Sequence, residues 1–347
     1  MYNPGLLIMS AKIVFGEEWI RKNRTLFSVM KMLWGLPGAS RSDIARVLGV
    51  SKTAISNSVS RLMALGMIEE GGTSMTKLGK RPISLRFKRE LFVSLGISFH
   101  DGDAVEICLA DANGHPIANR KASFKYSNWK EKCDFAAKLA VKTLSELASG
   151  SRSILGACVS LTGIFNPATG ILMSSAQFPD EYGIDIKTRL SKGLGMPVEL
   201  INLSHLLAFT EHRCGKAIGM KSFLYMHSGY GLGIFLNGKL YRGHQGQAGE
   251  IGWMRISDDG PRGRDGRVGL FGDVAPLYKI TDRLEYIIAA NGNTLAKKYM
   301  EGKSRKVDLS MVVAAIKDGD LLCAQMLNET FRSIGNVVLD LAYIFNP

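Results

Sequence analysis

Two segments of this 347-residue chain follow the same pattern of strands and turns, about 130 residues apart. The first, residues 91–117, reads LFVSLGISFHDGDAVEICLADANGHPI and contains an Asn113-Gly114 turn between two apolar runs. The second, residues 222–243, reads SFLYMHSGYGLGIFLNGKLYRG and contains the corresponding Asn237-Gly238 turn. Asn-Gly between apolar runs is a strong β-hairpin signal. A repeated hairpin predicts a domain with two lobes that begin alike.

The segments between these hairpins complete an α/β pattern. A helical stretch is expected from about Lys130 to Ser149, followed by the strand ILGACVSL and by the strand and helix PVELINLSHLLAFTEHR. Duplicated lobes that open with hairpins and continue with helices are typical of the two-lobed actin and sugar-kinase architecture, a ribonuclease H-like fold. In such a fold, ligands bind between the lobes.

Composition places the chain among ordinary globular proteins. It is 46% hydrophobic with a mean hydropathy of +0.05, which suits a protein with real cores rather than a disordered tail. No apolar run reaches the roughly 18 residues of a membrane helix and no secretion signal is visible, so we expect a cytoplasmic protein. The five cysteines stand singly among apolar neighbours, which favours small buried residues over a disulfide framework.

The positive charge of the chain is concentrated in its N-terminal quarter. Residues 1–90 hold 15 Lys and Arg against 6 Asp and Glu, so they carry 9 of the net charge of +13. A basic domain beside a nearly neutral bulk predicts a polyanionic partner, most simply double-stranded DNA. A solvated basic face is the alternative that charge alone leaves open.

The same quarter of the chain has the pattern of a helix-turn-helix. After a first helix from Asn23 to Trp34, residues 39–72 read ASRSDIARVLGVSKTAISNSVSRLMALGMIEEGG. This stretch predicts a helix, a turn at Gly49, a second helix that Ser51 caps, and a stop at Gly66. In DNA-binding proteins with this motif, the second helix enters the major groove.

The second helix has two distinct faces when its residues are placed at 100° intervals. Ile55, Val59 and Leu62 form one apolar stripe, which we expect to pack against the domain. Short polar side chains lie on the opposite face, where they can approach base edges, and basic residues flank them where phosphates lie. The residues expected to contact DNA are Ser51, Lys52, Thr53, Ser56, Asn57, Ser60 and Arg61.

A basic hairpin follows the second helix. Met67–Glu70 is expected to form a short strand, Gly71–Thr76 a loop, and LGKRPISLRFKR a second strand that Pro82 places at an edge or interrupts. A basic strand pair beside a recognition helix grips the phosphate backbone while the helix reads bases. The hairpin is therefore interpreted as a wing. Its basic residues are Lys80 and Arg81, which we expect to contact DNA, and Arg86, Lys88 and Arg89.

Four stretches are more specific than any pattern of strands and helices. They are SDIARVLGVSKTAISNSVSRL, the GKRP of the wing, NPATGILMSSAQF and LNGKLYRGHQGQAGEIGWM. With them the chain, from about Asn23 to Pro347, resembles the ROK family of repressors and sugar kinases, specifically its regulators with an N-terminal winged helix. The expected domains are an N-terminal arm in residues 1–20, a winged helix-turn-helix in 21–90, a first kinase-like lobe in 91–215 and a second in 216–347.

The resemblance does not extend to the residues of phosphoryl transfer. Kinase members open the first lobe with a DxGxT turn that holds phosphate and metal, whereas residues 96–100 read GISFH here. They also need an Asn-Asp pair whose acid takes the proton of the sugar hydroxyl, and in this chain Leu203 follows Asn202. We therefore expect no catalytic residues. The glycines of Ser228–Gly233 are expected to serve a tight hairpin rather than a nucleotide.

A loop rich in glycine and arginine, GPRGRDGRVGLFG, corresponds to the zinc loop of the family. The resemblance places a histidine and three cysteines on the metal, and this chain has Trp253, Gly263, Asp265 and Leu270 in their positions. One carboxylate without a thiolate or imidazole neighbour cannot make a tetrahedral zinc site, so we expect no metal and no other cofactor. The loop arginines can still contact DNA or a partner, although a solvated loop is favoured.

The sugar pocket that the resemblance implies is retained in part. Asn202 and Glu250 are present, whereas Trp253 and Gly272 replace a histidine and an acid, and the Pro-Gly turn of the family is changed. The expected contacts of a sugar-like effector are Thr162, Gly163, Asn202, Glu250 and Trp253. The indole offers a stacking face, and the amide and carboxylate offer directional hydrogen bonds. The alternative is a retained scaffold in which Glu250 only satisfies backbone amides.

The chain stops at Pro347, where members of the family continue with a strand, a Gly-Gly turn and closing helices. The second lobe is therefore expected to lack its last elements and to be truncated. A sheet without its last strand exposes unpaired edge groups and apolar surface. Either a partner subunit covers that surface or the chain is a truncated product.

These features predict a sequence-specific DNA-binding regulator, a repressor without catalysis. It is expected to bind a two-fold operator as a homodimer or a higher homo-oligomer. Movement of the lobes, with or without a ligand, is expected to change the spacing of the two wings. Two other functions stay open, namely a non-catalytic subunit that pairs with an intact relative and a sugar kinase. A kinase would need the acid that Leu203 replaces.

Overall fold

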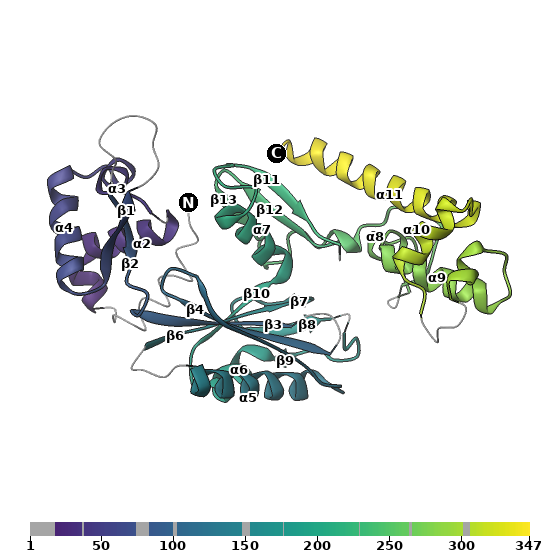
Figure 1. The fold of residues 1–347 in the computed structure, drawn as a ribbon, viewed down its shortest axis with the longest axis horizontal. Coiled ribbons are helices and arrows are strands. Elements are labelled where there is room, and N and C mark those ends of the chain that lie inside the picture. The colour runs from purple at the N-terminus through teal and green to yellow at the C-terminus, as the bar shows by residue number, and fades with distance from the viewer. Residues whose placement is uncertain are drawn as a thin grey trace. The chain divides into compact units, whose positions relative to one another are not determined.

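The computed structural model describes residues 18–36, 38–73, 83–99, 103–147, 153–175, 177–228, 230–263, 266–300 and 306–347 (Figure 1). The chain divides into two compact units, Met1–Leu203 and Ser204–Pro347. Within the described ranges, no helix is both long enough and apolar enough to cross a membrane.

The first unit begins with a winged helix-turn-helix. Its elements are the helices α2 (Arg24–Gly35), α3 (Arg41–Leu48) and α4 (Lys52–Ala64) and the antiparallel strands β1 (Ile68–Thr73) and β2 (Ile83–Phe87). The apolar stripes of the helices meet the hairpin in one core, in which Val29, Met30 and Leu85 are completely buried. A bridge between Ser40 and Ser84 ties the start of α3 to the hairpin.

A five-stranded sheet with the order β10-β6-β3-β4-β5 forms the rest of the first unit, the first lobe. Its strands are β3 (Phe92–Phe99), β4 (Ala104–Asp111), β5 (Pro116–Ser123), β6 (Ser153–Leu161) and β10 (Val198–Asn202). The β3, β4 and β5 strands are antiparallel, whereas β6 and β10 run parallel to β3. Parallel neighbours need crossover connections, and α6 (Ile186–Leu194) lies in the connection from β6 to β10.

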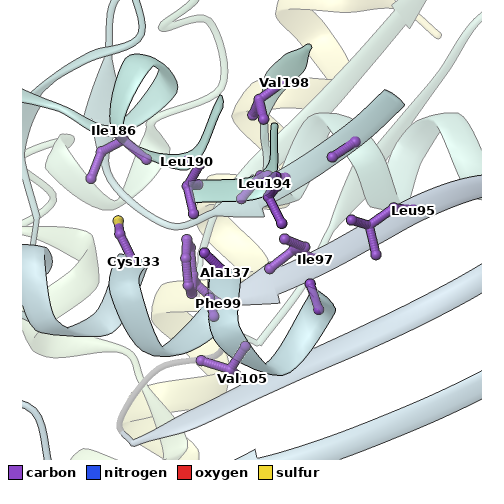
Figure 2. Close-up of a cluster of buried hydrophobic side chains, with 14 of the residues drawn as sticks. Leu95, Ile97, Phe99, Val105, Cys133, Ala137, Ile186, Leu190, Leu194 and Val198 are labelled. Atoms are coloured by element: carbon purple, nitrogen blue, oxygen red, sulfur yellow. The ribbon is translucent and has the colours of Figure 1, made fainter. Parts of the chain in front are cut away.

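Apolar side chains fill the core between this sheet and the two helices beneath it. The helix predicted between Lys130 and Ser149 is α5 (Trp129–Leu147), which lies beside α6 on one face of the sheet (Figure 1). Figure 2 shows Ile97 of β3, Cys133 of α5 and Leu190 of α6 in this core, where each is at most 2% exposed. The packing fixes the strands whose ends carry the candidate ligand residues.

A small sheet of three short strands extends the first lobe. It consists of β7 (Ile164–Phe165), β8 (Ile171–Ser174) and β9 (Ile184–Asp185), all antiparallel. Its first strand begins two residues after Thr162, so the small sheet and the end of β6 together hold the turn at Thr162 and Gly163.

The second unit begins within α7 and continues with the predicted second hairpin. Its sheet contains β11 (Phe223–Met226), β12 (Leu232–Leu236) and β13 (Lys239–Tyr241), packed with α7 (Leu203–Cys214). Asn237 and Gly238 both have positive φ, at 51° and 74°, as the Asn-Gly signal predicts. The helices that follow are η1 (Ile251–Trp253), α8 (Phe271–Val274), α9 (Leu277–Ala289), η2 (Leu295–Tyr299), α10 (Leu309–Lys317) and α11 (Leu321–Phe345).

The end of α11 carries apolar side chains that are open to solvent. Phe331 and Leu339 are each 54% exposed, Ile344 is 68% exposed and Tyr343 is 80% exposed. The sequence predicts exposed apolar surface in the second lobe, and α11 has such a surface. That the lobe lacks closing elements stays a prediction.

Candidate functional site

Residues that cap the helix ends determine the turn between α3 and α4. Ser40 forms a capping box with Asp43, whose carboxylate is held below its ordinary pKa chiefly by the hydrogen bond from the Ser40 hydroxyl. Gly49 ends α3 in the left-handed conformation, at φ 66°, which a residue without Cβ adopts at little cost. Ser51 then caps α4 by accepting a hydrogen bond from the Ala54 amide at 3.2 Å. These bonds set the direction in which α4 leaves the turn.

The two faces of α4 lie as its periodicity predicts. Ile55, Val59 and Leu62 are completely buried in the core of the domain. Ser56 is half-buried on the edge of the polar face. The exposed candidate DNA contacts are Ser51, Lys52, Thr53, Asn57, Ser60 and Arg61. The helix therefore presents a continuous polar surface of short side chains with a cation near each end.

The cations on α4 differ from those on α3 in their surroundings. Arg41 and Arg46 on α3 form ion pairs with Glu70 and Asp43, at 2.8 and 2.9 Å. Among the residues that the structure describes, no carboxylate pairs with Lys52 or Arg61. Phosphate contacts at α4 therefore need no existing ion pair to be broken.

The wing is a hairpin whose tip falls outside the described residues. Lys80 and Arg81, the expected phosphate contacts, lie in the segment 74–82 and are among those outside. Two other basic residues of the hairpin have carboxylate partners, since Arg86 pairs with Glu69 at 2.8 Å and Arg89 pairs with Asp111 at 2.6 Å. Arg89 is thus part of the junction with the first lobe, a role that the sequence did not indicate.

Three candidate ligand residues meet at one edge of the first-lobe sheet. Asn202, the last residue of β10, is 8% exposed and pairs in register with Leu161, the last residue of β6. Thr162 and Gly163 follow Leu161 directly, so they lie at the same edge. Gly163 has φ 112°, and a Cβ there would lie 2.5 Å from the Ser174 carbonyl oxygen. The turn therefore requires glycine, as the Pro-Gly of the family does.

An aromatic cluster closes the end of β3, where kinases resembling this chain open their phosphate turn. Phe99 is 2% exposed and its ring lies 5.6 Å from that of Trp129. Beside it, burial raises the pKa of Tyr126 to about 12. A filled apolar site does not offer the open backbone amides that phosphates bind.

Lys132 is a buried cation that the sequence interpretation missed. It is completely buried, and its Nζ lies 5.3 Å from the Phe99 ring and 5.4 Å from the Trp129 ring. The ammonium donates a hydrogen bond to Oε1 of Gln177 at 2.6 Å. The signal was present, because Lys132 stands on the same helical stripe as Trp129 and the buried Ala136.

The glycine-rich turn of the second unit packs tightly against α7. A Cβ on Gly231 would lie 1.9 Å from Oγ of Ser204, which is 3.0 Å from Nε2 of His227. A Cβ on Gly233 would lie 2.2 Å from that of Ala208. Close packing against α7 therefore accounts for both glycines without a nucleotide.

Glu250 and Trp253 belong to the second unit, whereas Thr162, Gly163 and Asn202 belong to the first. Glu250 is half-buried and precedes η1, and Trp253 ends it. The indole is 41% exposed, with the guanidinium of Arg267 stacked 4.8 Å from the ring centroid. Arg267 thus already covers part of the ring that the sequence offers to a sugar.

Comparison with known proteins assigns the family. The profile of the ROK family matches residues 100–347, and the profile of a winged helix-turn-helix DNA-binding domain matches residues 22–69. The chain belongs to the ROK family. The predicted combination of a ROK domain with an N-terminal winged helix-turn-helix is therefore confirmed, and the chain is a DNA-binding regulator of this family.

Relatives of the chain include both regulators and kinases. The xylose repressor of Caldicellulosiruptor bescii is 23% identical over 336 residues, which cover 96% of this chain and 83% of the repressor. A ROK transcriptional regulator related to the Mlc protein of E. coli has a similar structure, with a TM-score of 0.72 and 20% identity over 94% of this chain and 81% of the other. A ROK glucokinase from Streptomyces griseus shares the fold over 74% of this chain and 80% of its own, with a TM-score of 0.58 and 18% identity.

In this ROK protein the loop of residues 255–271 is organised by its own backbone. Bridges join Arg255 to Leu270 and Arg262 to Val268, and the Ile256 amide donates to the Gly269 carbonyl at 2.8 Å. The described part of the loop, which excludes residues 264 and 265, contributes to no group of three or more potential metal ligands. Of the described positions that correspond to the zinc ligands, Trp253, Gly263 and Leu270 carry no side chain that ligates zinc.

Proposed function

We propose that this ROK regulator is a sequence-specific repressor that acts in the cytoplasm without kinase activity. In this proposal two copies bind a two-fold operator, each placing α4 in the major groove, and a sugar-like effector changes operator affinity. The observation that carries the proposal is the exposed polar face of α4 above a completely buried apolar stripe of Ile55, Val59 and Leu62.

The side chains on α4 suit base reading by a helix in the major groove. Asn57 is exposed at the middle of the face, and an amide can donate to and accept from an adenine edge at once. Ser56 and Ser60 are short enough to let the helix approach the bases. Lys52 and Arg61 lie near the two ends of the helix, where they can neutralise phosphates.

The absence of kinase activity is proposed from two positions. Leu203 stands where kinases of the family carry an acid, and a leucine cannot accept the proton of a sugar hydroxyl. The aromatic side chain of Phe99 is buried at the end of β3, where the phosphate turn would begin. Each position removes a separate part of phosphoryl transfer.

The effector is proposed to be a sugar or sugar derivative. Two observations support this. Asn202 and Glu250 are the residue types that the family resemblance implies for a sugar pocket, and the chain is similar to xylose repressors. Thr162 and Gly163 add a turn at the edge where Asn202 lies. Trp253 would contact the ligand with the part of its ring that Arg267 leaves open. Calorimetric titration with pentoses and hexoses tests this part, and no heat with any of them would remove the effector from the proposal.

Selection of genomic DNA fragments by the purified protein tests the DNA-binding part. The native protein is compared at one salt concentration with the double variant Lys52→Ala, Asn57→Ala. A matched control is Asn119→Ala, Lys138→Ala, which removes the same two side-chain types from exposed positions of the first lobe.

Enrichment of one motif with two-fold symmetry by the native protein and the control, and its loss in the α4 variant, is the expected result. A Lys-to-Ala change at a phosphate contact also lowers the salt dependence of binding by about one unit of slope. Equal enrichment by all three proteins, or none, would contradict base reading by α4. The second candidate, a subunit that pairs with an intact relative, then becomes the better explanation.

A further inference from the structure

The winged helix-turn-helix and the first lobe share one hydrophobic core. Phe92 at the start of β3 and Ala112 after β4 are buried in the same cluster as Val29 and Ile44 of the DNA-binding domain. The ring of Trp34 on α2 lies 5.4 Å from that of Phe92. Packed aromatic and aliphatic contacts across a junction resist relative movement, because separating the surfaces exposes them to water.

The connection between the two parts is short and internally bonded. Only residues 88–91 separate β2 from β3. The Lys88 amide donates to the Met67 carbonyl at 3.1 Å, and the Leu91 amide donates to the Lys88 carbonyl at 3.1 Å. A connection this short with its amides engaged leaves little of the freedom of a flexible linker.

The turn between β4 and β5 forms hydrogen bonds with β2, the last strand of the wing. The Phe87 amide donates to Oδ1 of Asn113 at 3.1 Å, and Nδ2 of Asn113 donates to the Phe87 carbonyl at 2.8 Å. One side chain from the first lobe thus takes the place of a neighbouring strand for the end of β2. Such a paired bond fixes both the distance and the register of the two elements.

Asp111, in the same turn, makes a second contact with the DNA-binding domain. Its side chain is 2% exposed and receives a hydrogen bond of 2.6 Å from Nε of Arg89, in the connection after β2. The amides of Asn113 and His115 donate to its other oxygen at 2.9 and 3.0 Å. The carboxylate therefore fixes the conformation of the turn through the two amides. Through Arg89 it also binds the turn to the DNA-binding domain.

We propose that the Asp111–His115 turn is a coupling element that fixes the winged helix-turn-helix to the first lobe, so that α4 moves with β4 as one rigid body. The consequence for DNA binding rests on the proposed function. If the first lobe carries α4 rigidly, the spacing of two recognition helices in a dimer is set by the lobes. A change in the lobes then reaches DNA without any hinge at the junction.

The coupling itself is tested without DNA by measuring a distance across the junction. Spin labels are attached through non-natural amino acids at Val47 on α3 and Lys142 on α5, which are both exposed. The distance distribution is recorded in the native protein and in Asn113→Ala. Asn119→Ala, an exposed asparagine of the same hairpin, is the matched control.

The expected result is one narrow peak for the native protein and the control, and a broad or double distribution for Asn113→Ala. Asn113→Ala can also disturb folding, so Arg89→Gln provides a second variant. It removes the guanidinium of Arg89, an exposed partner of Asp111, and leaves Asp111 itself unchanged. Combination of the two changes is expected to broaden the distribution further. A single narrow peak in all variants would overturn the coupling, as would a broad distribution in the native protein.

DNA binding gives a second readout that loss of stability alone does not produce. With an operator motif in hand, the half-site spacing is changed in steps of one base pair. The native protein is expected to lose at least about tenfold in affinity away from the preferred spacing, whereas the uncoupled variants lose less and bind a single half-site as before. If the native protein binds no DNA, the proposed function fails while the distance measurement still decides the coupling. Equal spacing profiles for all variants count against the coupling element.

Discussion

Asp111 shows how much a single side chain of the junction depends on its ionisation. Burial alone acts to raise its pKa, but the hydrogen bond from Arg89 and those from the amides of His115 and Asn113 outweigh burial, and the pKa lies below its ordinary value. The imidazole of His115, 3.5 Å away, is the other titratable group that faces it. An aspartate with a lowered pKa stabilises the folded state at any pH where it is ionised in both states.

The prediction concerns the variant Asp111→Asn. The stabilisation by the carboxylate is complete above the unfolded pKa of about 3.9 and is lost as the pH falls through the lower folded value. The native protein is therefore expected to exceed the variant in free energy of unfolding by about 2 kcal/mol from about pH 5 upward, and by less below about pH 4. Urea unfolding at several pH values measures the difference.

A matched control for this prediction is Asp103→Asn, an exposed aspartate just before β4. Its difference from the native protein is expected to stay small at every pH. A difference for Asp111→Asn that stays constant between pH 7 and pH 3 would mean that the charge of the carboxylate does not hold the junction.

At the scale of single residues, sequence patterns predicted which face of a helix a residue lies on better than they predicted which residue it bonds to. The period of 3.6 residues placed Ile55 and Asn57 on opposite faces of α4, because that placement depends only on the helix itself. The same period put Lys132 on a buried stripe, but its partner Gln177 lies 45 residues further along the chain. No local pattern contains such a pair, and so the buried cation was missed.

At the scale of elements, the hairpin of residues 255–271 shows how a loop is ordered by its own contacts. Gly269 has φ 72°, and a Cβ there would lie 1.9 Å from the Ser257 carbonyl oxygen. Arg262 donates to the Gly266 carbonyl at 2.6 Å, and Arg267 stacks on Trp253. The sequence predicted a solvated loop from its glycines and arginines, and Arg262 and Arg267 are exposed. The hydrogen bonds within the loop could not be predicted, because they form only between residues that folding brings together.

A prediction follows for Arg267→Ala. Loss of the stack is expected to lower the free energy of unfolding by about 1 kcal/mol and to speed amide exchange within the hairpin, because an exposed cation–π contact is worth roughly that much. The control is Arg255→Ala, since Arg255 lies in the same hairpin but makes an exposed ion pair with Asp258 and an exposed hydrogen bond to the Ser257 carbonyl in place of a stack.

Hydrogen exchange read by mass spectrometry, with and without a strong chelator, measures the effect. The chelator is expected to change neither the exchange rates nor the midpoint of thermal unfolding. Faster exchange in the native protein after chelation would show that a metal holds the hairpin after all. Identical exchange in Arg267→Ala and Arg255→Ala would show that the stack contributes nothing to its order.

At the scale of elements, the wing was predicted as a hairpin but not with the right bounds, because β1 continues to Thr73, into the segment expected to be a loop, and β2 ends at Phe87. Two short strands around a loop predicted a hairpin, and β1 and β2 form one. The expected start of the second strand at Leu78 lies outside the described residues, whereas β2 begins at Ile83, directly after Pro82. Arg89 was interpreted as part of the basic wing because its partner, Asp111, comes from an element 22 residues further on.

At the scale of the whole molecule, the family fold was predictable and the arrangement of its site was not. The repeated hairpins and four specific stretches were enough for a ROK domain after a winged helix-turn-helix, which the profiles confirm. The candidate ligand residues divide between the two units, with Asn202 in one and Glu250 in the other. Sequence gives the residue types at such positions but not the distances between them.

The proposed absence of kinase activity rests on two separate positions, so that a change at one of them alone is not expected to restore phosphoryl transfer. Phosphoryl transfer needs a proton acceptor beside the sugar and an open backbone for the phosphates. In the proposal, Leu203 stands in the place of the acceptor, and Phe99, buried with Trp129 and Lys132, occupies the place of the open backbone. The variant Leu203→Asp restores only the acceptor. We therefore expect neither the native protein nor this variant to release ADP from ATP in the presence of xylose, glucose or other common sugars.

A coupled assay of ADP release, with an active ROK glucokinase as the positive control, measures this. The acceptor contributes about 10² to 10⁴ to the rate, so if the phosphate site is also absent, as we propose, the return of the acceptor alone does not raise the rate to a measurable level. Sugar-dependent ADP release by the native protein would show that the chain is a kinase and that another residue accepts the proton. Release by Leu203→Asp alone would show instead that the phosphate site works despite Phe99, and that the chain lost its activity through a single position.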